Sequence, residues 1–202
     1  MRIKICGITT IADAEGCVAA GADMIGLNFV PGSPRAIDVT RARHIADAVR
    51  GRAEIVGVVA DLDEATLVAL RAAVGLDRLQ LHGSEPPELV ATLAPHAFKA
   101  LRVGSADDAA EASRYAGLVL IDAKVAGALG GTGRTVDFAL AAPLARARPI
   151  LLAGGLRPEN VADAVRAVEP WGVDAASGVE IAPGVKDLDA VAALVRAARS
   201  GS

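Results

Sequence analysis

Two titratable side chains stand at the ends of apolar runs, where acid–base chemistry is feasible. Cys6 ends the run Arg2–Cys6, and Asp122 ends the run Leu118–Asp122. Because parallel strands of an α/β sheet end at the same rim, a thiol and a carboxyl group at two strand ends could act as a base and an acid. The alternative for Cys6 is a buried structural thiol, which is our interpretation of Cys17. The alternative for Asp122 is a helix cap or a loop salt bridge.

Two turns late in the chain contain glycine and are candidates for binding an anion. They are Gly154-Gly155 and Ser177-Gly178. Glycine lets backbone N–H groups approach an anion, and a following helix N-terminus adds partial positive charge. The alternative for Gly-Gly is simply the end of a strand. Arg35 lies in a loop after an earlier strand. Its guanidinium suits a carboxylate, although most loop arginines are merely solvated.

These residues require a frame of alternating strands and helices. Apolar, β-rich runs predict eight strands, at Arg2–Cys6, Met24–Phe29, Glu54–Ala60, Arg78–Leu81, Ala97–Val103, Leu118–Asp122, Ile150–Ala153 and Gly172–Ala175. A helical stretch follows each strand, most clearly at Ile11–Ala20, Arg41–Val49, Glu64–Val74, Glu159–Val168 and Leu188–Ala198, and less clearly near Pro86 and Ala106. We predict N-caps at Thr10, Thr40 and Asp63.

Eight βα units in succession predict a (β/α)8 TIM barrel in one compact domain, residues 1–202, with 200–202 as a disordered tail. An open doubly wound sheet is the alternative, but it more often carries a Gly-rich phosphate loop after its first strand. Side chains alternate along a strand, so Lys4 should share the inward face with Cys6. A buried charge needs a partner, and Asp174 on the predicted eighth strand is the candidate. The long loop Ala123–Val136 is a predicted lid over the site.

Composition excludes several classes of function. The net charge is −3 without a basic run, which argues against nucleic-acid binding. No apolar stretch approaches the roughly 20 residues of a membrane span, and the first residues do not resemble a signal peptide. The two cysteines have neither metal-ligand nor disulfide spacing, which fits a cytoplasmic location. Of the three histidines, only His82 ends a strand and could line a site, whereas His44 and His96 should be structural.

Short motifs along the whole chain resemble those of the phosphoribosylanthranilate isomerases of tryptophan biosynthesis. In order they are Lys4-Ile5-Cys6-Gly7-Ile8-Thr9, Gly21-Ala22-Asp23, Gly32-Ser33-Pro34-Arg35, Gln80-Leu81-His82-Gly83, Asp122, Gly130-Gly131-Thr132-Gly133, Leu152-Ala153-Gly154-Gly155-Leu156 with Asn160-Val161, and Ser177-Gly178-Val179-Glu180 with Pro183-Gly184-Lys186-Asp187. Each motif is weak alone, but their order and spacing are specific. Two departures are the absence of a Phe from Val56–Ala60 and Ala176 where a Ser is common.

The resemblance implies an Amadori rearrangement of N-(5-phosphoribosyl)anthranilate to 1-(2-carboxyphenylamino)-1-deoxyribulose 5-phosphate. It implies Cys6 as the general base and Asp122 as the general acid. The glycine turns would bind the phosphate through backbone N–H groups, and Arg35 would bind the anthranilate carboxylate. No cofactor or metal is implied, and the only partner is the small-molecule substrate, bound by a monomer or homodimer.

Three alternatives stay open at this point. A related bifunctional isomerase, which also serves histidine biosynthesis, is expected to carry Asp instead of Cys at the end of its first strand. A metal-dependent epimerase is disfavoured, because the histidines are not paired in ligand spacing. A non-catalytic ligand-binding barrel would tolerate the loss of Cys6 without losing its ligand.

Overall fold

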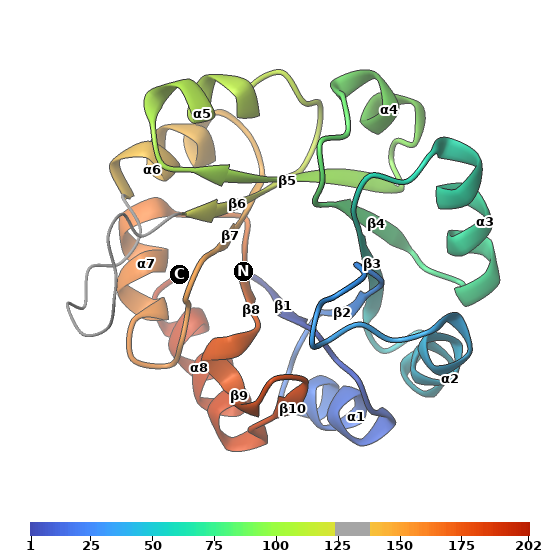
Figure 1. Ribbon diagram of the computed structural model, residues 1–202. Helices are drawn as coiled ribbons and strands as arrows, with labels where there is room; N and C mark the ends of the chain where they lie inside the picture. Colours follow the sequence, from blue (N-terminus) through green and yellow to red (C-terminus); the bar gives the residue numbers. More distant parts are fainter. Residues whose placement is uncertain (124–137) are drawn as a thin grey trace.

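The computed structural model describes residues 1–123 and 138–202 and contains a closed barrel of eight parallel strands in chain order, surrounded by helices (Figure 1). The barrel strands are β1 Arg2–Cys6, β2 Met24–Asn28, β3 Glu54–Val59, β4 Arg78–Leu81, β5 Ala97–Val103, β6 Val119–Ala123, β7 Ile150–Ala153 and β8 Gly172–Ala175. The helices are α1 Ile11–Ala19, α2 Val39–Val49, α3 Glu64–Val74, α4 Pro87–Thr92, α5 Ala106–Ala112, α6 Phe138–Ala147, α7 Val161–Val168 and α8 Leu188–Ser200. The predicted TIM barrel is confirmed.

Most predicted boundaries differ from the observed ones by two residues or fewer. One predicted cap is wrong, because α2 begins after Asp38, whose carboxylate accepts a hydrogen bond from the Arg41 N–H, and Thr40 lies inside the helix. The predicted tail is also too long. Ser200 is the last residue of α8, and its hydroxyl donates to the Ala197 carbonyl. Residues 124–136 of the predicted lid lie outside the described residues.

Alternation along the strands sorts the apolar side chains into two layers. Inward-facing side chains fill the barrel, namely Met24, Val56, Phe98, Ala100, Leu120, Leu151 and Ala153. The outward-facing ones, such as Ile3 and Ile5 of β1, pack in the layer beneath the helices. Because each strand is covered on both faces, it reads as a nearly continuous apolar run. The barrel interior is therefore a packed core, and polar groups on the inward face stand out.

Lys4 is such a polar group, and it lies where the barrel closes. It is fully buried and is paired in register with Asp174 across the junction of β1 and β8. Its ammonium donates to the Asp174 carboxylate over 2.9 Å. Burial alone would lower the pKa of Lys4, but the Asp174 charge raises it above its ordinary value. The predicted inward direction and the predicted partner of Lys4 are both confirmed.

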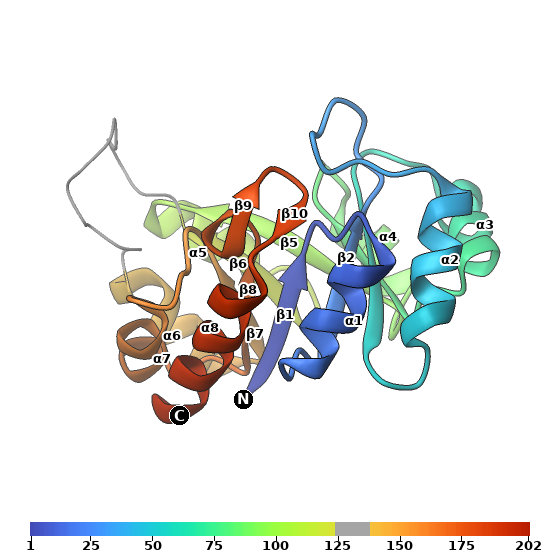
Figure 2. The same cartoon turned by 90° about the horizontal axis from the view of Figure 1, so that it is seen from below.

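A short antiparallel hairpin follows the last barrel strand and was not predicted from the sequence. A 3₁₀ turn, Ser177–Val179, leads from β8 into β9 (Glu180–Ala182) and β10 (Val185–Lys186). Figure 2 shows this hairpin at the end of the barrel toward which β1 points, whereas both chain termini lie at the opposite end. The hairpin therefore belongs to the rim where barrel enzymes carry their functional loops.

Candidate active site

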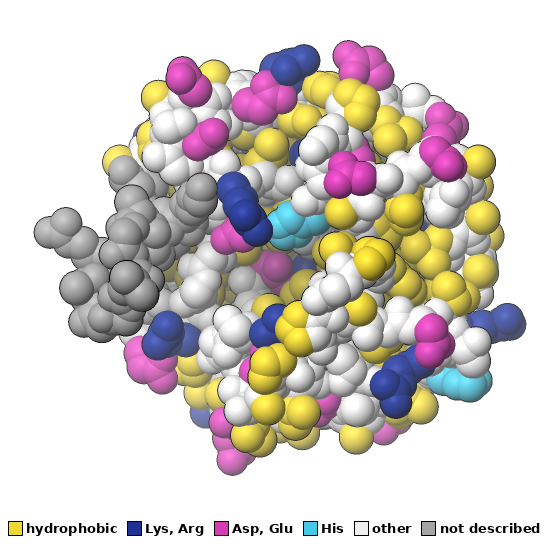
Figure 3. All heavy atoms as spheres, viewed as in Figure 1, with side chains coloured by type: hydrophobic (Ala, Val, Ile, Leu, Met, Phe, Trp, Pro, Cys, Tyr) yellow, Lys and Arg dark blue, Asp and Glu magenta, His cyan; other side chains and the backbone are white. Residues whose placement is uncertain are grey.

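All seven predicted site residues line a single cavity of about 250 Å³ at the carboxyl ends of the strands. They are Cys6, Arg35, Asp122, Gly154, Gly155, Ser177 and Gly178. The other lining residues are Asn28, Val58, Gln80, His82, Leu120, Ala153, Leu156, Asp174 and Ala176. Figure 3 shows this face hollowed near its centre, with basic, acidic and histidine side chains gathered around the hollow. Residues separated by most of the chain thus meet in one pocket.

Cys6 and Asp122 reach the pocket from well-separated strands. Each follows an inward-facing residue two positions earlier, Lys4 on β1 and Leu120 on β6, so alternation directs both side chains inward. In the closed barrel, β8 and β7 lie between β1 and β6. The thiol and the carboxyl group therefore approach the pocket from different walls, with space for a molecule between them.

Opposing effects act on the Cys6 thiol. Burial is the largest of them and raises its pKa, and the Asp174 carboxylate raises it further. The ammonium groups of Lys4 and Lys186 act in the opposite direction, but the net pKa remains above the usual value. The cations beside the thiol therefore do not outweigh burial. The thiol is therefore mostly protonated at neutral pH in the free protein.

The two glycine turns present backbone donors to the same pocket. Within the described residues 1–123 and 138–202, no group accepts a hydrogen bond from the N–H of Gly154, Gly155, Ser177 or Gly178. At Gly178, a Cβ atom would lie 2.0 Å from the Leu156 carbonyl oxygen, so only glycine allows the turns after β7 and β8 to approach so closely. The arrangement offers an anion these four donors, which are unpaired within the described part of the chain.

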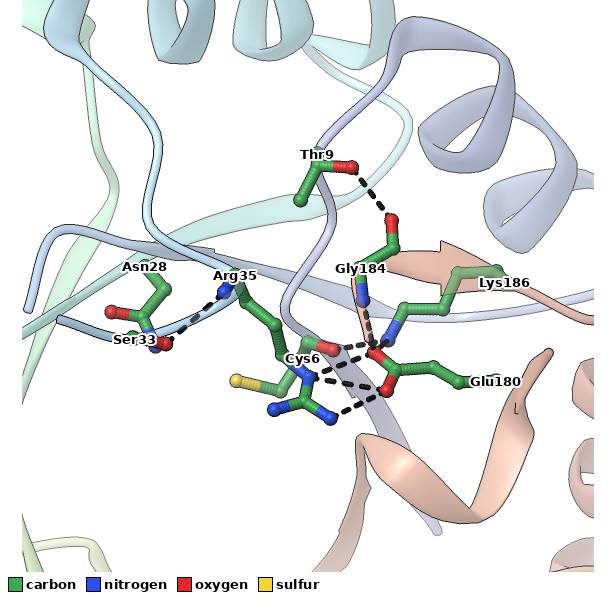
Figure 4. Close-up of polar contacts among 8 residues, drawn as sticks. All are labelled: Cys6, Thr9, Asn28, Ser33, Arg35, Glu180, Gly184 and Lys186. Carbon is green, nitrogen blue, oxygen red and sulfur yellow. Dashed lines mark hydrogen bonds and ion pairs between the residues drawn. The ribbon is translucent and has the colours of Figure 1, made fainter. Parts of the chain in front are cut away.

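Arg35 is not a free cation in this structure. Its Nε lies 2.9 Å from Oε1 of Glu180 and its Nη2 lies 2.6 Å from Oε2, which makes a two-pronged ion pair (Figure 4). The hydrogen bond to Glu180 raises the pKa of Arg35. A Cβ atom on Gly7, which has a φ of +76°, would lie 2.4 Å from Arg35 Cδ. Gly7 thus leaves room for the arginine beside the turn that follows Cys6.

Gln80 and His82 form a polar pair on the pocket wall. They are two residues apart at the end of β4, and the Gln80 amide nitrogen lies 3.1 Å from His82 Nδ1. Burial lowers the pKa of His82, so the ring is neutral at pH 7. Gln80 is buried, and its Oε1 has no hydrogen-bond partner among the described residues. Gln80 Oε1 is therefore a buried acceptor within the pocket wall, unpaired among the described residues.

Sequence reasoning missed several of the polar groups at the site. Strand alternation could have identified Asn28 and Gln80, since each lies on the inward face near a strand end. Glu180 and Lys186 carry no periodic signal, because they lie on the short hairpin. Among the described residues, no group of three or more His, Cys, Asp or Glu side chains could hold a metal ion. Nor does any helix in that part of the chain have the length and apolar character to cross a membrane.

Comparison with known proteins identifies the family. A family model described as N-(5'phosphoribosyl)anthranilate (PRA) isomerase matches residues 3–197. The chain belongs to this isomerase family. A relative named N-(5'-phosphoribosyl)anthranilate isomerase, from Myxococcus xanthus, is 45% identical over 206 residues, covering 99% of this chain and 97% of that protein.

Solved structures of isomerases from the same family share the whole fold. The phosphoribosyl anthranilate isomerase of Thermotoga maritima superposes with a TM-score of 0.91 at 36% identity and covers 99% of both chains. A second isomerase structure, in complex with reduced 1-(o-carboxyphenylamino)-1-deoxyribulose 5-phosphate, has a TM-score of 0.88 at 34% identity, again over 99% of both chains. The family resemblance carried by the short motifs is confirmed.

Proposed function

We infer that this chain is an isomerase that converts N-(5-phosphoribosyl)anthranilate into 1-(2-carboxyphenylamino)-1-deoxyribulose 5-phosphate in tryptophan biosynthesis. The observation that carries this conclusion is the meeting of Cys6, Asp122 and the two glycine turns in one pocket of a chain that matches the isomerase family over residues 3–197. The complex of a family member with a reduced form of the product supports the same ligand class. The rearrangement moves protons without net oxidation, so we propose that it proceeds without a cofactor or metal.

Asp122 and Cys6 divide the two proton transfers of the reaction. Asp122 donates a proton to the ring oxygen, and the furanose opens to an imine at C1. Cys6 as thiolate removes the proton from C2, which gives an enolamine that becomes the ketone of the product. Their separate walls support this division, because the ring oxygen and C2 are different atoms of one sugar. The nearby ammonium groups of Lys4 and Lys186 would stabilise the thiolate when it forms.

The phosphate binds between the turns after β7 and β8. The N–H groups of Gly154, Gly155, Ser177 and Gly178, which have no acceptor among the described residues, are the donors, and neither turn needs a basic side chain. Barrel enzymes frequently hold phosphate after these two strands. The substrate then extends across the cavity, with its sugar between Cys6 and Asp122.

Arg35 binds the anthranilate carboxylate at the far side of the cavity. Glu180 occupies Nε–H and one N–H of Nη2, but a guanidinium carries five N–H donors. Three donors remain, and two of them, one on Nη1 and one on Nη2, form the terminal edge of the group. That edge is itself suited to a two-pronged carboxylate contact. The ion pair with Glu180 is therefore compatible with the predicted role of Arg35.

An isomerase assay on the purified protein tests the proposal directly. We expect formation of 1-(2-carboxyphenylamino)-1-deoxyribulose 5-phosphate, followed by its absorbance or by chromatography. The same protein should be offered the aminoaldose of the histidine pathway, because a bifunctional isomerase would convert both substrates. Tight binding of the anthranilate substrate without turnover would favour a ligand-binding barrel and overturn the proposal.

Two further expectations concern the setting of the enzyme. We propose a cytoplasmic enzyme, supported by the two free cysteines, Cys6 and Cys17. We also propose a monomer or a homodimer that binds neither nucleic acid nor a membrane. The relative from Thermotoga maritima is described as a dimeric phosphoribosylanthranilate isomerase from which monomers were generated. Sedimentation equilibrium of the purified chain distinguishes the two states.

A further inference from the structure

Glu180 is the centre of a buried polar network that the acid–base mechanism does not use. Only 3% of its side chain is exposed. Its carboxylate accepts hydrogen bonds from Arg35 and, over 2.6 Å, from the Lys186 ammonium, whose side chain is fully buried. The Gly184 N–H adds a longer contact of 3.3 Å. Figure 4 shows these groups converging on Glu180 from the hairpin and from the loop after β2.

The network keeps Glu180 charged. Burial alone would raise the pKa of Glu180, but hydrogen bonds from Arg35 and Lys186 hold it below its ordinary value. A buried carboxylate with two cationic partners forms hydrogen bonds that are stronger than neutral ones. The orientation of the Arg35 guanidinium is consequently fixed by Glu180 in the absence of substrate.

This orientation has a chemical consequence for the pocket. The side edge of the guanidinium, formed by Nε and Nη2, faces Glu180, so the terminal edge is the one left for a ligand. A guanidinium is planar and rigid, and therefore fixing one edge also fixes the direction of the other. We propose that Glu180 is a positioning residue that aims the terminal edge of Arg35 at the anthranilate carboxylate and thereby sets the preference for carboxylated substrates. This inference rests on the proposed isomerase function.

A purely structural role for Glu180 is the competing explanation. The hairpin has anchors besides Glu180, because the Thr9 hydroxyl donates to the Gly184 carbonyl over 2.6 Å and the Lys186 ammonium donates to the Cys6 carbonyl over 2.6 Å. A loss of structure would disturb Cys6 and therefore slow every substrate alike. A loss of the Arg35 orientation would slow the reaction only of a substrate that carries the carboxylate. The two explanations therefore predict different substrate preferences for a Glu180 variant.

The test compares two substrates, N-(5-phosphoribosyl)anthranilate and its analogue made from aniline, which lacks the carboxylate. Glu180→Gln keeps the side-chain shape but removes the charge that holds Arg35. We expect kcat/KM for the carboxylated substrate to fall about 10-fold or more, mostly through KM, and kcat/KM for the aniline analogue to change less than about threefold. In the Arg35→Met background, Glu180→Gln should have no further effect on the preference. Glu64→Gln, on the exposed start of α3, is the matched control and should leave both rates unchanged.

Each outcome bears on the proposal. Equal losses on the two substrates, or no loss on either, would overturn the positioning role, whereas a wild-type protein without isomerase activity would contradict the proposed function instead. If Glu180→Gln fails to fold, Arg35→Lys provides a second test, because an ammonium keeps the charge but has no second edge. We expect Arg35→Lys to lose the preference for the carboxylated substrate. Retention of the full preference by Arg35→Lys would overturn the two-edge arrangement.

Discussion

Cys6, the proposed base, lies in an environment that disfavours its charged form. Burial raises the pKa of its thiol despite two neighbouring ammonium groups. Burial likewise raises the pKa of Cys17 to about 12, but Cys17 packs in the outer core and not in the pocket. The difference between the two cysteines is therefore access to the cavity, and not the pKa direction.

The raised pKa of Cys6 predicts its alkylation behaviour. In a Cys17→Ala background, the rate of reaction with iodoacetamide should continue to increase above pH 9, because the thiolate fraction grows until the pH exceeds the pKa. A small thiol with a pKa near ~8.5 should level off earlier. Mass spectrometry of samples quenched at a series of pH values measures both rates. A plateau in the Cys6 alkylation rate at or below pH 8 would contradict the raised pKa of its thiol.

The division of proton transfers predicts the cost of removing each group. Cys6→Ala and Asp122→Asn should each reduce turnover by about 10²-fold or more, which is the contribution typical of general acid–base catalysis. Binding of the reduced product should persist in both variants, because the phosphate contacts are untouched. Steady-state kinetics and calorimetric titration measure the two effects. Near-normal turnover in either variant would remove that residue from the mechanism.

The buried His82 should resist protonation. Its pKa is lowered by burial, so the ring should remain neutral at pH 6.5 and gain a proton only at lower pH. The contact from the Gln80 amide nitrogen makes Nδ1 the acceptor and places the ring proton on Nε2. Nitrogen NMR of labelled protein distinguishes the two tautomers. A titration midpoint above 6.5 would contradict the effect assigned to burial.

Helix α2 shows how a local signal can be misplaced by two residues. Thr40 and Asp38 are both common N-cap residues, and the sequence pattern alone favoured the wrong one. The hydrogen bond from the Arg41 N–H to Asp38 is 2.8 Å long. Asp38→Ala should therefore destabilise the protein by about 1 kcal/mol, whereas Thr40→Ala should change stability by less than about 0.5 kcal/mol. Urea denaturation of the two variants makes the comparison, and equal effects would contradict the cap assignment.

The strands and most helices could be predicted because their signals are local and periodic. The run Ile150–Ala153 is short, apolar and followed by Gly-Gly, so its limits are visible in the sequence. The hairpin that contains Glu180 and Lys186 lacks such periodicity, and its strands have only three and two residues. Its contacts with Arg35 and Cys6 join residues about 145 and 180 positions apart. Contacts between residues so far apart in the sequence form only when the barrel closes. The spacing of residues along the chain therefore does not predict them.

A buried ion pair, Lys4 with Asp174, lies where the barrel closes between β1 and β8. Lys4→Met should leave the Asp174 carboxylate without its cation, and we expect a loss of about 3–5 kcal/mol in the free energy of unfolding. The double variant Lys4→Met/Asp174→Leu should recover part of this loss, since no unpaired charge remains in the core. Chemical denaturation of the wild type and both variants at pH 7 provides the values. A single variant within about 1 kcal/mol of the wild type would show that closure does not rely on the pair.

The adjacency of β1 and β8 also places both ends of the chain together, at the end of the barrel away from the hairpin (Figures 1 and 2). A linker fused to residue 1 or residue 202 therefore leaves on the side opposite the cavity. The molecule can be tethered to a bead, an electrode or a second enzyme through either end with its entrance facing the solution. A short peptide that joins the two ends would also permit circular permutation. The new termini would then lie in the loops at the end of the barrel opposite the cavity, where they do not interrupt the pocket.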